Sequence, residues 1–281
     1  GGIGIAAHAG QRRFIDEGPD AVLAAAERLG KVNGPRVTVG IAPHSVRAVP
    51  LSWWRELAGF DGVIHAHVAE QDAEVRACVG ATGKGPLAYL ASQGVVTERF
   101  TAVHLTRPSE GDPEIVARSG MSLCVCPTTE MDLGDGFLPN QLRLPGQLCV
   151  GSDSHAVIDP FTEARALEWH GRALARKRLI LRQEADTDAL AGQVLTALGR
   201  GGRRSLGLRE DAGSAGGVAD LVGLRLDAPG AVGVPPLVAA AFVATPQWVT
   251  DVWVDGEHVV ADGQHRDRTA VVEKARQWCA P

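Results

Sequence analysis

Short apolar runs alternate with helical patterns along the first part of this chain. Six runs have the length and apolar character of strands, at Gly2–Ala7, Val37–Ala42, Gly62–Val68, Phe100–Leu105, Met121–Cys126 and Gln147–Gly151. Helices are predicted between most of them, at Ala21–Leu29, Leu51–Leu57, Gln71–Cys78 and Glu114–Arg118. Strands and helices that alternate at this spacing predict a parallel sheet covered by helices.

Polar residues at the strand ends decide between two parallel architectures. An open doubly wound sheet fits the alternation, but side chains drawn from the C-terminal ends of several strands are typical of a (β/α)8 barrel. The sequence supplies six strand-like runs where a barrel has eight. We therefore predict an α/β fold with a TIM-type (β/α)8 barrel that here lacks about two N-terminal strands.

The pattern changes in the last third of the chain. Two helices are predicted at Pro160–Arg182 and Asp188–Leu198. Beyond them, Asp220–Leu226 and Trp248–Val260 alternate in polarity, and the second run turns at Asp255-Gly256, a dipeptide typical of tight hairpins. The alternation and the turn therefore predict a small β-sheet in the C-terminal tail.

Composition narrows the functional classes. With 281 residues and 45% apolar content, the chain can bury a large core and hold one barrel-sized domain with a small appendage. A formal net charge of −5 gives no reason to expect nucleic acid or an anionic membrane surface as a partner. The apolar segment Val234–Val243 is too short to cross a bilayer. Five cysteines without a Cys-x-x-Cys pair favour a cytoplasmic location.

The stretch from Gly62 to Glu70 contains residue types that can bind a metal and transfer protons. His65 and His67 lie two residues apart on a predicted strand, so they point to the same face, with His67 nearer the C-terminal end. Glu70 lies past that end and can fold back over the site. A divalent metal lowers the pKa of a bound water to about 7, and a carboxylate beside it can move protons to a leaving group. This pattern favours metal-assisted hydrolysis, with two core histidines and a solvated glutamate as the alternative.

Two more predicted strands end in polar residues of the same kind. His104 closes the run Phe100–Leu105, and Asp153 follows Gln147–Gly151. Imidazole and carboxylate are ligands that suit zinc or iron, so His67, His104 and Asp153 are candidate metal ligands. Taken singly, His104 could be a buried hydrogen-bonded histidine and Asp153 a helix N-cap or turn residue. Three such residues at separate strand ends favour a common site.

Several motifs together resemble those of the amidohydrolase superfamily. They are Ala42-Pro43-His44-Ser45-Val46-Arg47, the stretch His65 to Gln71, Ala102-Val103-His104-Leu105-Thr106, Cys126-Pro127-Thr128-Thr129-Glu130 with Leu133-Gly134-Asp135-Gly136, and Gly151-Ser152-Asp153-Ser154-His155. The resemblance runs from about Gln11 to the tail. It implies a partial metal-dependent barrel over residues 1–215 and the C-terminal part of a small β-sandwich over residues 216–281.

The resemblance also implies roles for individual residues. His67 and Asp153 would be metal ligands at the fifth and eighth barrel strands. Glu70 would shuttle protons, and His104 would hydrogen-bond the substrate or the attacking water rather than bind the metal. Asp153 would also accept a proton. One zinc ion per subunit is expected, although the donor types leave iron open.

Within the superfamily, the motifs are similar to those of enzymes that convert N-formimino-L-glutamate and water into N-formyl-L-glutamate and ammonia, a step of histidine degradation. This likeness implies a small dicarboxylate substrate and a homodimer. Arg47 suits such a substrate because a guanidinium can grip a carboxylate with two hydrogen bonds. His44 is placed beside it in the substrate pocket. A solvated loop arginine and a loop histidine bound to backbone are the alternatives.

One feature departs from the family pattern. Members bind metal first through a His-x-His pair at the end of barrel strand one, and no such pair precedes Val37. The sequence is therefore expected to be a C-terminal portion of a longer enzyme. Three hypotheses follow: the formimino hydrolase, a superfamily deaminase that acts on a purine or aminopyrimidine ring, and an inactive truncated barrel that serves as a scaffold. A ring substrate offers no carboxylate to Arg47, and a scaffold should not bind zinc tightly.

Overall fold

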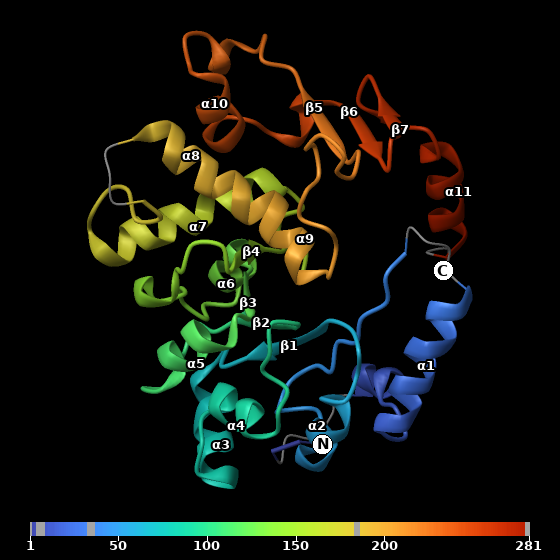
Figure 1. Cartoon of the computed structure of the whole chain (residues 1–281), viewed down its shortest axis with the longest axis vertical. Coiled ribbons are helices and arrows are strands. Elements are labelled where there is room, and N and C mark those ends of the chain that lie inside the picture. Colours follow the sequence, from blue (N-terminus) through green and yellow to red (C-terminus); the bar gives the residue numbers. More distant parts are fainter. Residues whose placement is uncertain (1, 4–8, 33–36, 183–185, 279–281) are drawn as a thin grey trace.

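The structure of this chain is a computed structural model that describes residues 2–3, 9–32, 37–182 and 186–278. Over these ranges it forms a four-stranded parallel sheet with the order β1-β2-β3-β4 and a separate four-stranded antiparallel sheet with the order β5-β6-β7-β8. Figure 1 shows the parallel strands in the middle of the molecule, with α3, α4, α5, α7 and α8 along one side of them. The predicted α/β class with a parallel sheet is confirmed.

Four of the predicted strands form the parallel sheet. They are β1 (Ile64–Val68), β2 (Phe100–His104), β3 (Ser122–Val125) and β4 (Leu148–Val150). Helices fill the connections, as parallel pairing requires: α3 (Asp72–Thr82) and α4 (Pro86–Ser92), then α5 (Asp112–Ser119), then α6 (Pro127–Asp132) with the 3-10 turn Asn140–Leu142. Because all four strands run the same way, their C-terminal ends meet at one edge of the sheet.

The prediction of a strand at Val37–Ala42 is wrong. Only Ile41 pairs with the sheet, as an isolated parallel bridge to Ile64. The N–H of Ile41 donates to the carbonyl of Val63 at 3.1 Å, and the N–H of His65 donates to the carbonyl of Ile41 at 3.0 Å. Pro43 follows at the next pairing position and has no N–H to donate, so the regular ladder is interrupted, and the next backbone bond is shifted by one residue, from the N–H of His67 to the carbonyl of His44 at 2.9 Å. Of the predicted strand Gly2–Ala7, residues 4–7 lie outside the described residues.

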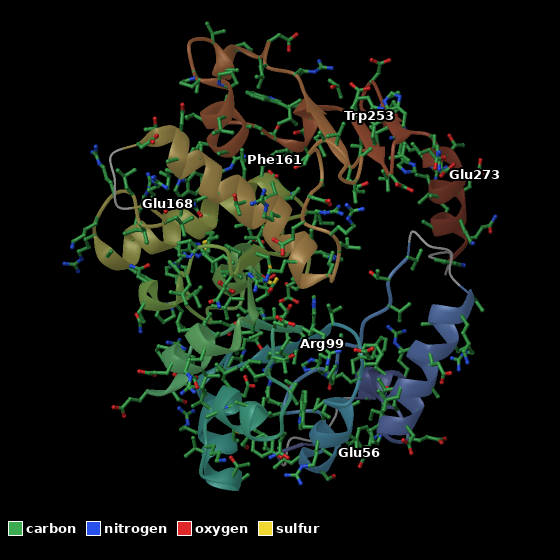
Figure 2. The ribbon with its side chains drawn as sticks, viewed as in Figure 1. Glu56, Arg99, Phe161, Glu168, Trp253 and Glu273 are labelled. Carbon is green, nitrogen blue, oxygen red and sulfur yellow. The ribbon has the colours of Figure 1, made fainter. Side chains whose placement is uncertain are left out.

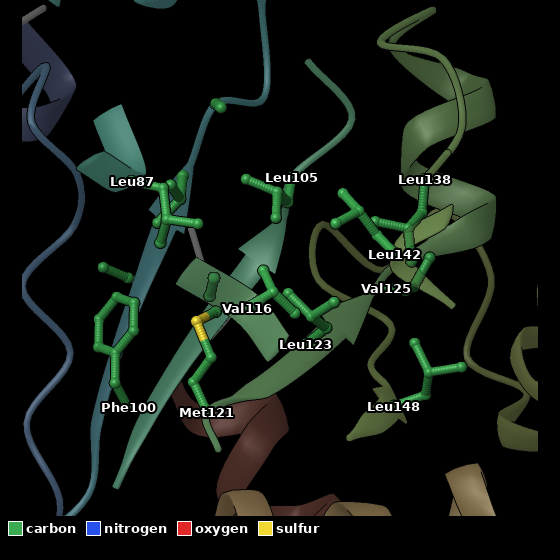
Figure 3. Close-up of a cluster of buried hydrophobic side chains, with 14 of the residues drawn as sticks. Leu87, Phe100, Leu105, Val116, Met121, Leu123, Val125, Leu138, Leu142 and Leu148 are labelled. Atoms are coloured by element: carbon green, nitrogen blue, oxygen red, sulfur yellow. The ribbon is translucent and has the colours of Figure 1, made fainter. Parts of the chain in front are cut away.

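Large apolar side chains pack between the parallel sheet and its helices (Figure 3). Phe100 and Leu105 come from β2 and its end, Leu123 from β3, and Leu87 from α4, and each is at most 1% exposed. Burying one such side chain contributes about 1.5–3 kcal/mol. This packing fixes the strands whose ends carry the candidate site.

Truncating one of these core side chains should measurably destabilise the chain. We expect Leu123→Ala to lower the free energy of unfolding by about 2–5 kcal/mol, because it removes buried methyl groups and leaves a cavity. Chemical denaturation followed by circular dichroism measures the change. Leu133→Ala is the control, since Leu133 is 53% exposed. Equal losses in the two variants would contradict the assignment of Leu123 to the core.

The first of the two long helices is shorter than predicted. Asp159 is the N-cap of helix α7 (Pro160–Ala175), and its side chain accepts hydrogen bonds from the N–H groups of Phe161 and Thr162. It ends at Ala175, rather than near Arg182, because Arg176 adopts a left-handed conformation with φ of 51°. The chain then turns back, and the N–H groups of Ile180 and Leu181 donate to buried Glu168 at 2.9 and 2.8 Å. Figure 2 labels Phe161 and Glu168 on this helix.

The second long helix and the remaining short helices complete this part of the chain. Helix α8 (Thr187–Thr196) begins one residue before Asp188, the predicted start of this helix. It continues through a π-helical turn (Ala197–Gly201) into α9 (Gly202–Ser205). Nearer the N-terminus lie α1 (Pro19–Val32), α2 (Trp54–Leu57) and two 3-10 turns (Ala9–Phe14 and Leu51–Trp53). The predicted helices at 21–29 and 51–57 therefore lie where helical elements form.

The tail forms the antiparallel sheet, from β5 (Leu221–Leu224), β6 (Val249–Val254), β7 (Glu257–Ala261) and β8 (Gln264–His265). Trp253, labelled in Figure 2, lies on β6. The predicted turn between β6 and β7 is confirmed: Asp255 and Gly256 have φ of 51° and 77°, which matches the twist of a tight hairpin. Two helices in this tail were not predicted, α10 (Pro236–Phe242) and α11 (Arg268–Trp278). Within the described residues, none of the helices has the length and apolar character needed to cross a bilayer.

Candidate functional site

Side chains from four strand ends converge at the C-terminal edge of the parallel sheet. Glu70 follows β1, His104 ends β2, Glu130 lies on α6 just after β3, and Asp153 follows β4. One donor atom from each of His67, His104 and Asp153 lies within 4.8 Å of the others. The structure therefore brings together the three residues that the sequence offered as candidate metal ligands.

The ring of His67 is held in one orientation by the backbone of His44. The carbonyl of His44 accepts the backbone N–H of His67 at 2.9 Å and lies 2.8 Å from its ring Nδ1. Because a carbonyl can only accept, Nδ1 carries the proton and Nε2 presents a lone pair. Nε2 lies 3.8 Å from Oδ1 of Asp153. Burial acts to lower the pKa of His67, but the nearby Asp153 carboxylate and the hydrogen bond to the His44 carbonyl raise it above its ordinary value.

His104 is held in the same way by Glu130. Its Nδ1 lies 3.3 Å from Oε1 of Glu130, and both side chains are fully buried. Oε1 of Glu130 also accepts the N–H of Cys126 at 2.9 Å. Burial raises the pKa of Glu130. The Nε2 of His104 is buried and makes no hydrogen bond within the described residues, and it lies 3.6 Å from Oδ2 of Asp153.

Asp153 sits on a loop that Thr129 holds in place. The Thr129 hydroxyl is bonded to the carbonyl of Ser152 at 3.2 Å and accepts the N–H of Ser154 at 3.3 Å. The carboxylate between them is a quarter exposed. The neighbouring His67 lowers the pKa of Asp153, and the nearby His104 acts in the same direction. Asp153 therefore offers a charged carboxylate between two imidazoles.

Glu70 lies on the other side of His104, with its Oε1 3.8 Å from Nε2 of that ring. Its second oxygen, Oε2, accepts a hydrogen bond from the guanidinium of Arg47. Burial acts to raise the pKa of Glu70, but the charge of Arg47, followed by that of His104, lowers it below the ordinary value. The N–H of Glu70 donates to buried Glu74 at 3.0 Å. Arg47 thus keeps a buried carboxylate charged beside the candidate metal ligands.

Two further histidines lie near the site in different positions. The ring of His44 is 4.6 Å from the ring of His67, and its Nδ1 is 3.0 Å from the Ser45 hydroxyl. Burial, followed by the charges of His67 and Arg47, lowers the pKa of His44 to about 4, so the ring is neutral at pH 7. His65 shares a face with His67, but its Nε2 lies 2.6 Å from the carbonyl of Ser205. His65 is therefore engaged outside the three-residue cluster.

The backbone at these strand ends adopts sparsely populated conformations. Ala69, His104, Leu105 and Asp153 all have positive φ, between 41° and 75°. Residues other than glycine pay about 1–3 kcal/mol for such conformations, which cluster at functional sites. Hydrogen bonds offset the strain, since the N–H of Leu105 donates to Val68 at 3.0 Å and the N–H of Arg107 donates to Ala69 at 2.8 Å. The sharp turns direct Glu70 toward His104, and His104 toward Asp153.

The donor set fits a zinc ion. Donors bound tetrahedrally to zinc at about 2.0–2.2 Å stand about 3.4 Å apart. Nε2 of His67 lies 3.8 Å from Oδ1 of Asp153 and Nε2 of His104 lies 3.6 Å from Oδ2, and one donor atom from each residue lies within 4.8 Å of the others, so small shifts would bring the donors to that spacing. Both imidazoles present Nε2, and the buried Nε2 of His104 makes no hydrogen bond within the described part of the chain. The imidazole of His67 and the carboxylate of Asp153 are donor types that zinc commonly uses, and Nε2 of His104 is close enough either to join them or to contact a water on the metal.

Sequence analysis gave no chemical role to Glu130 or Glu74, although both support the site. Glu130 appeared there only as part of a motif, whereas in the structure it lies on helix α6 and binds His104. Glu74 lies on the buried side of α3 and holds the backbone of Glu70. The available signal was position: each is an acidic residue in the first turn of a helix that directly follows a strand of the parallel sheet.

Comparisons with known proteins agree with this geometry. The model of the amidohydrolase family matches residues 12–259. A formimidoylglutamate deiminase of Pseudomonas aeruginosa is 35% identical over 271 residues, which is 93% of this chain and 59% of the relative. A 5-methylthioadenosine/S-adenosylhomocysteine deaminase of Halobacterium salinarum is 28% identical over 92% of this chain and 61% of its own length. This chain thus spans about three fifths of these curated relatives.

Solved structures show the same likeness. An amidohydrolase from Brucella melitensis has a TM-score of 0.81 and 32% identity, covering 99% of this chain and 62% of that one. An adenosine deaminase from Xanthomonas campestris, solved with bound zinc, has a TM-score of 0.79 and 28% identity, covering 92% of this chain and 61% of that one. The range that the family model matches, residues 12–259, contains His67, His104 and Asp153.

Proposed function

The chain belongs to the amidohydrolase family, and we propose that it carries the site for metal-dependent hydrolysis of N-formimino-L-glutamate to N-formyl-L-glutamate and ammonia. The observation that carries this proposal is the meeting of His67, His104, Asp153 and Glu70 at one sheet edge, with Arg47 beside them. The 35% identity to a formimidoylglutamate deiminase supports the choice of substrate.

The proposal extends to architecture and setting. We propose that β1 to β4, together with the bridge at Ile41, are consecutive parts of a (β/α)8 barrel, with residues 1–215 in the barrel and 216–281 in a small β-sandwich. The likeness of the chain to amidohydrolase structures supports the barrel. A homodimer and a cytoplasmic location stay predictions.

Each site residue then has a defined task. His67 and Asp153 would hold zinc, which when bound supplies the Lewis acidity that lets water attack near neutral pH. Glu70 takes a proton from the attacking water and passes one to the nitrogen that leaves as ammonia, while Asp153 accepts the other proton. His104 offers Nε2 to the water or the substrate. Arg47 fixes the substrate by holding a carboxylate away from the reacting carbon.

Arg47 favours a dicarboxylate over a ring substrate. Its guanidinium has five N–H donors, of which the described contacts use one on Glu70 and one on the Ser45 hydroxyl. Donor capacity therefore remains for a substrate carboxylate. A neutral purine or aminopyrimidine offers no such group, so the likeness to ring deaminases makes that activity the second candidate.

Zinc titration followed by an ammonia assay tests the proposal. The full 281-residue chain should bind zinc tightly and then release ammonia from N-formimino-L-glutamate, but not from 5-methylthioadenosine. The opposite substrate preference would favour the ring deaminase. A chain that neither binds zinc nor releases ammonia would contradict the proposal and favour a scaffold.

Glu130 should act through His104. We expect Glu130→Gln to reduce turnover by about 10–100-fold, because the neutral side chain supports the His104 ring less firmly. Zinc affinity, measured with a fluorescent competitor, should change by only a few fold if His104 serves the water or the substrate. Glu114→Gln, a matched change on α5, should leave both unchanged. A loss of zinc affinity as large as the loss of turnover would instead make His104 a metal ligand.

A further inference from the structure

Asp135 is a buried carboxyl group beside the site to which sequence analysis assigned no role. It lies just after α6 and is 4% exposed. Its Oδ1 accepts the side-chain N–H of Gln71 at 3.0 Å, and its backbone N–H donates to the carbonyl of Glu130 at 3.0 Å. Its other oxygen, Oδ2, is buried and makes no hydrogen bond to any described residue. A buried carboxylate oxygen without a donor is costly, which indicates that a ligand supplies the donor.

The Asp135 carboxyl faces Glu70. Burial raises the pKa of Asp135, the hydrogen bond from Gln71 opposes that shift, and Glu70 adds to it as a neighbouring acid. Arg47 binds Oε2 of Glu70 rather than Asp135, and the charge of His104 is the smallest of the effects on Asp135. Two neighbouring carboxyl groups therefore share little positive charge here, and a cationic donor in contact with both is favoured.

The loop geometry fixes this arrangement. Gly134 and Gly136 flank Asp135 with φ of 71° and 102°, conformations that side chains other than glycine seldom adopt. A Cβ on Gly136 would also lie 3.5 Å from the guanidinium of Arg107. Gln71 lies next to Glu70 in the chain, so its hydrogen bond to Asp135 ties the two carboxyl groups together. Asp135 is therefore held in place rather than free to turn toward solvent.

We propose that Asp135 accepts an N–H from the formimino nitrogen that leaves as ammonia, on the opposite side of that nitrogen from Glu70. The inference rests on the proposed function. A formimino group is an amidine and carries a positive charge at neutral pH, so its terminal nitrogen has N–H groups for both Glu70 and Asp135. An aminopurine is neutral and the formyl product is a neutral amide, so Asp135 selects for the cationic substrate.

Substrate and product differ at the group that Asp135 would contact, which makes them a matched pair of probes. The Michaelis constant for N-formimino-L-glutamate and the inhibition constant of N-formyl-L-glutamate are measured on the zinc-loaded full chain. Asp135→Asn should raise the Michaelis constant by about 10-fold or more, as expected for loss of a charged hydrogen bond. The inhibition constant of the product should stay within about 2-fold. Asp132→Asn, a change at an exposed position on α6, is the control and should alter neither constant.

The outcomes separate the inference from the proposed function. If Asp135→Asn weakens substrate and product equally, the residue only shapes the loop, and if it weakens neither, it does not touch the substrate; both results overturn the inference while the deiminase activity of the unaltered chain stands. If the unaltered chain releases no ammonia from N-formimino-L-glutamate, the proposed function fails and the inference fails with it. Should Asp135→Asn not fold, Gln71→Met removes the hydrogen bond to Oδ1 and should weaken substrate alone, by about 3-fold.

Discussion

Replacing Glu70 by Gln is expected to lower the rate of ammonia release by at least about 100-fold, the usual contribution of a general acid and base. Glutamine keeps the shape of the side chain and can still accept the hydrogen bond from Arg47, but it cannot take or give a proton. Zinc affinity should therefore change little, because the metal donors are His67 and Asp153. Substrate affinity should be retained to within about 10-fold, since only one charged contact to the formimino nitrogen is weakened.

Single-turnover kinetics with zinc titration distinguish this role from a structural one. Glu56→Gln provides the matched control, because Glu56 is exposed on α2 and lies outside the site (Figure 2). Glu74→Gln is a useful comparison, since Glu74 holds the backbone of Glu70 and its loss should cost less than the loss of the carboxylate itself. Turnover near that of the unaltered chain in Glu70→Gln would remove Glu70 from proton transfer.

The sequence was sufficient to predict that these residues come together, because the period of the strands and the position of each residue along the chain determine it. His65 and His67 alternate with buried Ile64, Ala66 and Val68, so they had to share a face of β1. Glu70, His104 and Asp153 each follow a strand, and parallel strands place their ends at one edge. Convergence of these residues follows from topology alone, without knowledge of any contact.

Other features depended on contacts that local patterns do not contain. The apolar run at Val37–Ala42 looks like a strand, but it forms only one bridge, at Ile41, because Pro43 has no N–H to continue the regular ladder. Helix α7 stops at Ala175 because Arg176 is left-handed, and the returning chain is held by two N–H groups that donate to Glu168, contacts that a helical period does not contain. The partner of Glu130 is 26 residues away, so its hydrogen bond to His104 appears only once the strands are aligned.

The largest expected change in substrate preference comes from replacing Arg47 by Met. We expect kcat/KM for N-formimino-L-glutamate to fall by about 100–1000-fold, because a substrate carboxylate would lose its charged partner in a partly buried site. Two effects contribute, since Arg47 also binds Glu70. A formamidine that lacks the two carboxylates isolates the second effect, and its hydrolysis should fall by about 10-fold or less.

The pH dependence separates the two effects further. Burial acts to raise the pKa of Glu70 and Arg47 lowers it, so removal of Arg47 should raise that pKa. Glu70 must be deprotonated to act as a base, and the acidic limb of the pH-rate profile should therefore move to higher pH in Arg47→Met for both substrates. Arg55→Met, at an exposed position on α2, should change neither the preference nor the profile. A fall of equal size for the dicarboxylate substrate and for the formamidine without carboxylates would show that Arg47 serves Glu70 alone, and a different residue would then have to bind the substrate carboxylate.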